Sequence, residues 1–425
     1  MANPAPLLSL LMPTKDRAEY ARHAVASVLA MDADDFELVV HDNSGGRELA
    51  DALAPHAGDA RLRYVHAAGP MPMSQNFEGA IAHARGQFVG CLGDDDGVTP
   101  RVLTLTRWMA GEGDRQEVDA LAPTTPALYY WPGVKGQAAA GQAAASGPAP
   151  GELHVTRHTG KRTLVDPERA LRRVARSGGA QFFGLPRLYH GVVRRACLER
   201  VRERVGRYLP GVSPDMAGAV ALASHVRRVC RVDAPLFVPG ASPRSGAGRG
   251  VQKTHQGELA KESFLDQQFV RAWPGGVPAY FSGPTMWGAA TLQALLATGR
   301  QDVAARFNYA ALHALCTTFV PSRRADTRAS LRSAPRGLVG SPAFFRASYA
   351  AHCVWHQARR VGNRLSRVGV TTHTGPQLAT IGDAVSLVGK MSGGAVPHAG
   401  GMDVPAASGS PDATAPHTQA SEPAA

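Results

Sequence analysis

The feature that most constrains the fold is a regular alternation of strand-like and helix-like segments over the first 110 residues. Four short apolar runs have the length of buried strands, and they cover residues 7–12, 36–40, 62–65 and 88–92. Segments with helical spacing of apolar residues separate them, at residues 18–29, 47–53 and 74–84, the last capped by Ser74. This β-α-β-α order predicts an α/β fold whose doubly wound, mostly parallel sheet is flanked by helices.

Polar clusters follow the first, second and fourth of these predicted strands. They are Thr14–Arg17, Asp42–Ser44 and Asp94–Asp96. Because the carboxyl ends of parallel strands lie at one edge of a sheet, where such folds bind ligands, we expect the three loops to meet in one crevice.

The triplet Asp94, Asp95 and Asp96 carries the strongest chemical signal. Adjacent carboxylates raise one another's pKa, and a cation placed between them removes that conflict. Hard divalent ions such as Mg²⁺ and Mn²⁺ prefer carboxylate oxygen and keep open positions for phosphates. The alternative is a solvated acidic turn, but the position at the end of an apolar strand favours the metal interpretation.

Three segments together resemble one known family. Residues 10–17 (LLMPTKDR) resemble an opening strand with its P-T-x-[ND]-R turn, and residues 39–44 (VVHDNS) resemble a second strand with its D-[DN]-x-S turn. Residues 84–96 (ARGQFVGCLGDDD) resemble the segment A-x-G-[ED]-[YF]-[IV]-x-[FW]-L-x-D-D-D. Their order and spacing resemble family 2 glycosyltransferases of the GT-A fold, in detail bacterial members with a G-D-D-D-G metal motif.

The resemblance implies a metal-dependent, inverting enzyme that moves a sugar from a nucleotide-diphosphate sugar to an acceptor hydroxyl, in surface polysaccharide or glycolipid synthesis. The donor-binding residues that it implies are Pro13, Thr14, Arg17, Asp42, Asp94 and Asp95. It implies Mg²⁺ or Mn²⁺ as the cofactor, held by Asp94 and Asp96. Gly93 stands where the common family form has an acid, so the metal-binding pair within the triplet stays open.

Several of these residues could also have a purely structural role. Asp42 could be an Asx-turn residue that bonds its own backbone. Thr14 and Arg17 could be a helix entry and a solvated surface charge.

Asp215 is the candidate catalytic base, because transfer to a hydroxyl needs a carboxylate within reach of the acceptor proton. It lies in the segment Val212–Met216, which resembles the position that follows the acceptor segment in this family. The alternative is an ordinary helix start, since Ser213, Pro214 and then an acid suit the first turn of a helix.

Tyr189 and His190 are candidate acceptor-site residues, because aromatic faces suit sugar rings and the family has its acceptor site in this region. They lie in a predicted strand over residues 188–193. The alternative is a core strand with a hydrogen-bonded histidine.

The pattern predicts a GT-A domain over residues 1–240, with a flexible insertion at 135–151, then a mainly helical, basic region at 241–390 and a disordered tail at 391–425. Residues 321–370 contain ten arginines and a single acid, Asp326, with four large aromatic residues among the arginines. Such a segment suits an anionic membrane surface, with a solvated basic face as the alternative.

Composition excludes several classes of protein. The formal net charge of +12 favours anionic partners, yet no nucleic-acid-binding motif accompanies it, so no nucleic acid is expected. Five scattered cysteines without a C-x-x-C pair argue against a zinc cage or disulfide framework. With no span-length apolar run and no leader pattern, we expect a cytoplasmic protein, with peripheral contact on the inner face of the cell membrane as a further hypothesis.

Two other functions stay open beside glycosyl transfer. A nucleotidyltransferase acting on sugar phosphates also uses carboxylates and Mg²⁺, but residues 12–17 lack the glycines that its first loop needs. An NAD enzyme fails for the same reason, since no G-x-G-x-x-G follows the first strand. A non-catalytic family member that binds nucleotide sugars is the remaining alternative.

Overall fold

The computed structural model describes residues 5–67, 69–124, 126–134, 150–252, 254–333, 342–365 and 370–391. The insertion predicted at 135–151 therefore lies outside the described residues except for its last two. The disordered tail predicted for 391–425 lies outside them except for residue 391.

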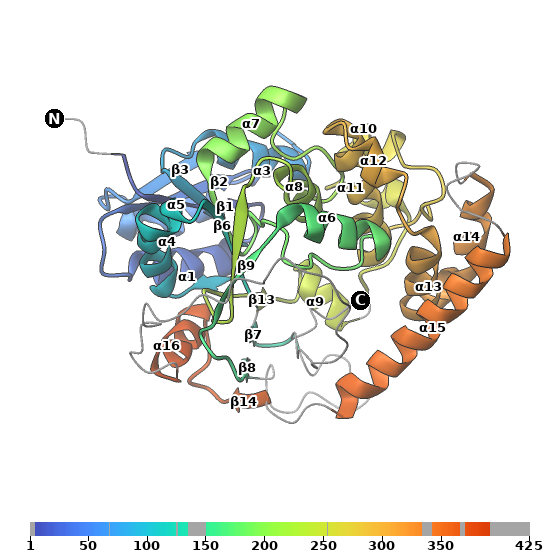
Figure 1. Cartoon of the computed structure of the whole chain (residues 1–425). Coiled ribbons are helices and arrows are strands. Elements are labelled where there is room, and N and C mark those ends of the chain that lie inside the picture. Colours follow the sequence, from blue (N-terminus) through green and yellow to red (C-terminus); the bar gives the residue numbers. More distant parts are fainter. Residues whose placement is uncertain are drawn as a thin grey trace, which may run out of the picture.

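An eight-stranded sheet organises the first half of the chain (Figure 1). In spatial order its strands are β3 (Leu62–His66), β2 (Phe36–Asp42), β1 (Leu8–Thr14), β4 (Phe88–Cys91), β10 (Val192–Arg194), β6 (Val118–Pro123), β11 (Arg228–Val232) and β9 (Arg162–Val165). The first four are parallel, β6 and β11 are parallel, and β10 and β9 run antiparallel to their neighbours. The predicted class, a mostly parallel sheet flanked by helices, is confirmed.

Both faces of this sheet are buried, which explains why β1 is a continuous apolar run instead of an alternating one. Leu8, Leu10 and Met12 point to the face covered by α1 (Ala18–Leu29) and α4 (Arg101–Ala110). Leu11 points to the opposite face, which packs on α3 (Met73–Ala82) and α7 (Arg195–Val205). This packing fixes the register of β1 and therefore the position of its last residue.

A second apolar core joins helices from two regions of the sequence. It contains α6 (Pro167–Arg176), α8 (Pro214–Leu222), α11 (Gly283–Ala297) and α13 (Tyr309–Phe319). α8 packs directly on α11, so this core includes residues on both sides of position 240. The division into domains at that position stays a prediction.

The remaining strands and α-helices lie outside the eight-stranded sheet and the helices named above. The strands are β5 (Gly97–Val98), β7 (Ala127–Tyr130), β8 (Glu152–Thr156), β12 (Phe237–Val238), β13 (Gly240–Ala241) and β14 (Val370–Thr374). The helices are α2 (Glu48–Ala52), α5 (Glu112–Arg115), α9 (Gly246–Val251), α10 (Gln267–Arg271), α12 (Gln301–Ala304), α14 (Arg324–Ala329), α15 (Pro342–Leu365) and α16 (Ile381–Met391). None of the described helices is long and apolar enough to span a membrane.

Two local predictions were wrong. Ser74 lies inside α3, whose first residue follows Pro72, and its hydroxyl contacts Asp266 instead of capping the helix. The strand predicted over residues 188–193 is reduced to Val192–Arg194 at its carboxyl end, because residues 188–190 form a turn against the end of β4.

Candidate functional site

The three predicted loops do meet at one edge of the sheet, at the point where the strand order reverses. The chain passes from β1 outward to β2 and β3, then returns to β4 on the other side of β1. Thr14 ends β1 opposite Asp42 at the end of β2, and Asp94–Asp96 follows β4. Ligands of open α/β sheets bind in the crevice at such a reversal.

Arg17 joins the first two aspartates of the triplet. Its Nε lies 2.9 Å from Asp94 Oδ1, and its Nη2 lies 2.9 Å from Asp95 Oδ2. The hydroxyl of Thr14 donates to Asp94 Oδ2 at 2.7 Å. Ser242 donates to Asp95 Oδ2 from its hydroxyl at 2.6 Å and from its backbone N–H at 3.0 Å. Arg17 therefore acts as an internal cation in a nearly buried carboxylate site.

Asp96 is held differently, because protein donors fill its carboxylate. Its Oδ2 accepts hydrogen bonds from the Gly93 N–H at 2.6 Å and the Tyr189 hydroxyl at 2.9 Å, and lies 2.6 Å from His190 Nε2. Its Oδ1 accepts from the Gly240 N–H at 2.7 Å. Four partners use the usual acceptor capacity of a carboxylate.

The backbone of His190 has a strained conformation, which indicates that its side chain is held in one position. Its φ of 52° lies in the left-handed region, which is unfavourable for a residue other than glycine. Its backbone N–H donates to Cys91 O at 2.9 Å, and its ring stacks 4.1 Å from that of Tyr189. The end of β4 thus holds both residues against Asp96.

A distant segment closes the site. β12 pairs with β5, which directly follows the triplet, and this pairing brings Gly240 and Ser242 against Asp96 and Asp95. A Cβ atom on Gly240 would lie 1.8 Å from the carbonyl oxygen of Asp95, so only glycine allows this approach. The indole N–H of Trp131 donates to the same carbonyl at 2.9 Å.

The charges of the site are unbalanced. Burial, together with the charges of Asp95 and Asp96, raises the pKa of Asp94 to about 7, although Arg17 and the Thr14 hydroxyl act in the opposite direction. Burial alone would raise the pKa of Asp96 too, but His190 and the N–H groups of Gly240 and Gly93 lower it. Three buried carboxylates near one arginine and one histidine leave negative charge that a further cation would offset.

Carboxylate oxygens are suitable ligands for a divalent ion. The partners that each of the three aspartates already has indicate which of them could bind one. Among the residues that the structure describes, no three His, Cys, Asp or Glu side chains are arranged to hold a metal ion. Asp94 has one partner on each oxygen, and Oδ1 of Asp95 has no hydrogen bond within the described residues. Asp96 has the most partners of the three, with three on Oδ2 and one on Oδ1.

Asp42 lies in a separate part of the crevice. Its Oδ1 accepts from the backbone N–H and hydroxyl of Ser44 at 2.9 and 2.5 Å, and its Oδ2 accepts from the Tyr64 hydroxyl at 2.7 Å. The Asx-turn alternative thus accounts for the bonds from Ser44 to Oδ1 but not for the bond from Tyr64 to Oδ2. Pro13 is buried within β1, opposite His41, and Asn76 donates to the carbonyl of Thr14 at 2.9 Å.

Asp215 is in the first turn of α8, outside the carboxylate cluster. Its Oδ1 accepts from the Met216 N–H at 2.7 Å and from the hydroxyl of Ser213. Its Oδ2 accepts from the indole N–H of Trp287 on α11 at 3.0 Å. The Trp287 ring packs 4.9 Å from that of Phe182, which places an aromatic surface beside this carboxylate.

The structure therefore brings Thr14, Arg17, Asp94, Asp95 and Asp96 together, and it adds Tyr189 and His190 to the same cluster as partners of Asp96. Sequence reasoning missed Ser242 and Gly240, because they contact the triplet from almost 150 positions away, and it missed Trp287 beside Asp215. The Gly- and Ser-rich run at 240–248 was the one signal for the closing segment.

The sequence of this chain matches known proteins over part of its length. Residues 9–120 match the family model of glycosyl transferase family 2. The chain is 31% identical over 101 residues to WcaA of Escherichia coli (strain K12), assigned as a glycosyl transferase of colanic acid biosynthesis. It is 35% identical over 95 residues to the uncharacterized protein y4gI of Sinorhizobium fredii. These matches cover 24% and 21% of this chain, 36% of WcaA and 10% of y4gI.

Solved structures show a more distant likeness. TarS 1–349 of S. aureus in complex with UDP-GlcNAc is 14% identical, with a TM-score of 0.48 over 84% of this chain and 92% of that one. The mannosyltransferase PcManGT of Pyrobaculum calidifontis, in complex with GDP-Man and Mn²⁺, is 16% identical, with a TM-score of 0.36 over 85% and 88%. The match to the model of glycosyl transferase family 2 over residues 9–120 contains the whole Asp94–Asp96 triplet.

Proposed function

We propose that this protein is a metal-dependent glycosyltransferase that moves a sugar from a nucleotide-diphosphate sugar to an acceptor hydroxyl. The observation that carries the proposal is the buried carboxylate cluster at the strand-order reversal, inside the matched family domain. Thr14, Arg17 and Asp42 lie at the same sheet edge and supply the hydroxyl, cation and acceptor that a nucleotide needs. Pro13 lines this edge from within β1.

We propose Mg²⁺ or Mn²⁺ as the cofactor, which when bound stabilises the negative charge of the departing diphosphate. The predicted metal pair is Asp94 and Asp96. The bonding favours Asp94 and Asp95, because Asp96 has the most protein partners of the three. Asp96 would then organise the loop through Gly93, Gly240 and His190.

In this proposal Asp215 removes the proton from the acceptor hydroxyl, and the sugar is transferred by a single displacement with inversion. The Trp287 N–H fixes the orientation of its carboxylate, and Oδ2 keeps an acceptor position for that proton. Asp215→Asn should retain donor binding and lose turnover. An active variant would place the base elsewhere.

The acceptor is the second substrate of the proposed reaction. The family match and the WcaA relationship support a saccharide or lipid-linked acceptor in polysaccharide synthesis. Tyr189 and His190 were predicted beside the acceptor, and their bonds to Asp96 keep them at the carboxylate cluster. A lipid-linked acceptor would bring the enzyme to a membrane surface.

A turnover assay tests the proposal. The full chain is incubated with UDP-, GDP-, CDP- and dTDP-sugars, with Mn²⁺ or with EDTA, and release of nucleoside diphosphate is measured. We expect one class of donor to be turned over with Mn²⁺ and not with EDTA. Asp95→Asn should lower the rate by about 100-fold or more. Asp51→Asn, on the exposed surface of α2, is the matched control and should keep full activity. Full activity of Asp95→Asn would contradict the proposal.

A further inference from the structure

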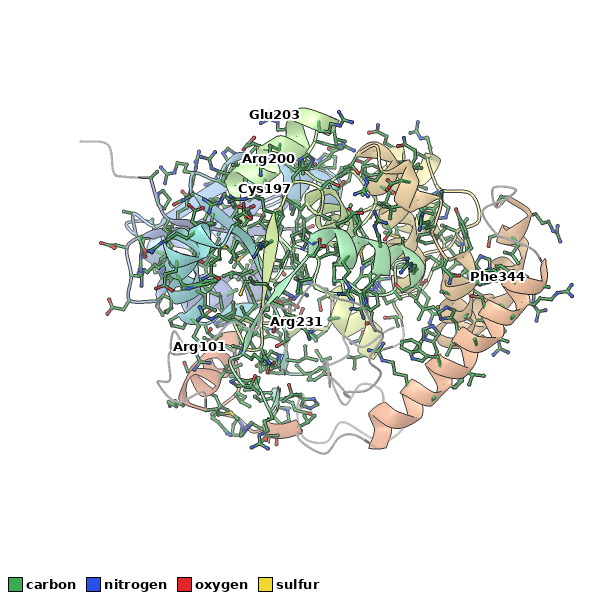
Figure 2. All side chains as sticks on the ribbon, in the orientation of Figure 1. Arg101, Cys197, Arg200, Glu203, Arg231 and Phe344 are labelled. Atoms are coloured by element: carbon green, nitrogen blue, oxygen red, sulfur yellow. The ribbon has the colours of Figure 1, made fainter. Side chains whose placement is uncertain are left out.

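Helix α15 presents large apolar side chains to solvent. Among the described residues, the exposed large hydrophobic side chains are Leu296, Phe344, Val354, Trp355 and Met391. Three of these five belong to α15, where Phe344 is 65%, Val354 69% and Trp355 50% exposed. Figure 1 shows α15 as a long helix along the outer edge of the molecule, and Figure 2 labels Phe344 on it.

The inner side of α15 is already occupied. His356 is buried and packs 5.8 Å from Phe319 of α13, and Phe345 packs 5.9 Å from His313 of the same helix. His352 lies 3.4 Å from Asn308 at the start of α13. The packing therefore fixes which side of α15 faces outward.

The outward side carries an apolar stripe about four turns long. Its residues are exposed and lie on one side of the helix, and they are Phe344, Ala347, Ala351, Val354, Trp355 and Ala358. Arg346 and Gln357 are exposed beside the stripe. A surface helix normally shows the reverse arrangement, with its apolar side on the core and its polar side in water. An apolar stripe of this length on the outside is typical of a binding surface.

Arginines lie on α15 beside this stripe and on α14, which packs on the same helix as α15 does. Arg346 is exposed on α15 itself, and the guanidinium of Arg359 lies 5.2 Å above the ring of Trp355. Arg324 and Arg328 are exposed on α14, which packs on α13 as α15 does. Asp326, the one acid between residues 321 and 370, lies 3.2 Å from Arg323 and so is already partly neutralised.

We propose that the outward side of α15, with the arginines of α14 beside it, binds an anionic lipid surface in the plane of the membrane. An interfacial helix sinks an apolar side with Trp and Phe to the level of the acyl chains, while flanking arginines contact lipid phosphates. A second copy of this chain would bring like-charged arginines together, which opposes pairing through this side. A nucleic acid would use the arginines and leave the alanine stripe without a partner.

This inference does not depend on the proposed glycosyl transfer. α15 shares no residue with the carboxylate cluster, so lipid binding and donor binding fail or succeed separately. Donor binding of each α15 variant, measured by calorimetry, keeps the two apart.

Vesicle co-sedimentation tests the proposal with the full chain. One set of vesicles contains phosphatidylcholine alone, and the other contains phosphatidylcholine with phosphatidylglycerol. We expect binding to the second set that weakens as salt rises, with a blue shift of tryptophan emission that is absent in Trp355→Phe. Equal binding to both sets, or binding to neither, would overturn the proposal.

Substitutions on α15 test whether its outward side is the surface that binds lipid. Phe344→Ser combined with Trp355→Ser should lower the partition coefficient by about tenfold or more, because both side chains lose their apolar contact with lipid. Leu296→Ser is the matched control, since Leu296 is 51% exposed on α11, and it should bind like the parent. Equal loss in both variants would overturn the assignment. So would a dimer without lipid that depends on Phe344 and Trp355, which would identify a second copy as the partner.

Discussion

Three consecutive aspartates have different surroundings in this protein, and partners, not sequence position, account for the difference. Asp94 and Asp95 share one guanidinium. Asp96 is surrounded by donors from three loops. A triplet that looks uniform in the sequence thus divides into two residues joined by one arginine and one that holds the loop together.

Asp96→Asn should therefore destabilise the fold, although the change is nearly isosteric. Whichever way the amide is oriented, its NH₂ group faces the N–H of either Gly93 or Gly240. An unpaired buried donor costs about 1–3 kcal/mol, which urea unfolding measures. Asp51→Asn should change the free energy of unfolding much less. If the Asp96 and Asp51 variants are equally stable, Asp96 does not organise the loop.

Asp94 should make stability depend on pH. Because its pKa is raised to about 7, the folded state binds a proton that the unfolded state has released above pH 4. Its stabilising contribution is complete below about pH 4 and is lost as the pH rises to about 7, at up to about 1.4 kcal/mol per pH unit.

The measurement is the difference in unfolding free energy between the parent and Asp94→Asn, followed from pH 5 to 8. We expect the parent to lose stability relative to the variant as the pH rises toward 7. A difference that is constant with pH would show that Asp94 titrates normally.

At the scale of elements, the site depends on one crossing of distant segments. The first four strands and α1 follow from local patterns, and α1 has the predicted bounds of 18–29. The pairing of β12 with β5 does not, because two-residue strands carry no periodic signal and the partners are about 140 residues apart. The sequence therefore indicated the carboxylates but not Gly240 and Ser242, which close over them.

Gly240→Ala tests this crossing. The added methyl group would lie 1.8 Å from the Asp95 carbonyl, so the β12–β13 segment must move away from the triplet. We expect a loss of about 2–4 kcal/mol in unfolding free energy, together with weaker nucleotide binding. Gly246→Ala is the control from the same segment, because its Cβ would meet its nearest neighbour, His255, at 3.5 Å, an ordinary contact. Equal stability of the two variants would contradict the close approach.

At the scale of the whole molecule, the chain combines a segment that matches the family model with a large helical part outside that match. The match ends at residue 120, while the second apolar core runs from α6 to α13 and includes the surroundings of Asp215. Composition predicted a basic, aromatic segment near the carboxyl end. Only the packing of α15 on α13 shows which of its residues face outward, because both sides of that helix carry aromatic residues.

The proposed metal-assisted donor site is best tested by calorimetric binding of UDP, GDP, CDP and dTDP to the full chain, each with and without Mn²⁺. We expect that one of these diphosphates binds, that Mn²⁺ strengthens its binding, and that Asp95→Asn removes the Mn²⁺ dependence. If the folded protein binds none of them, or if the Asp95 variant binds with the same Mn²⁺ dependence as the parent, the carboxylate cluster is not a metal-assisted nucleotide-sugar site.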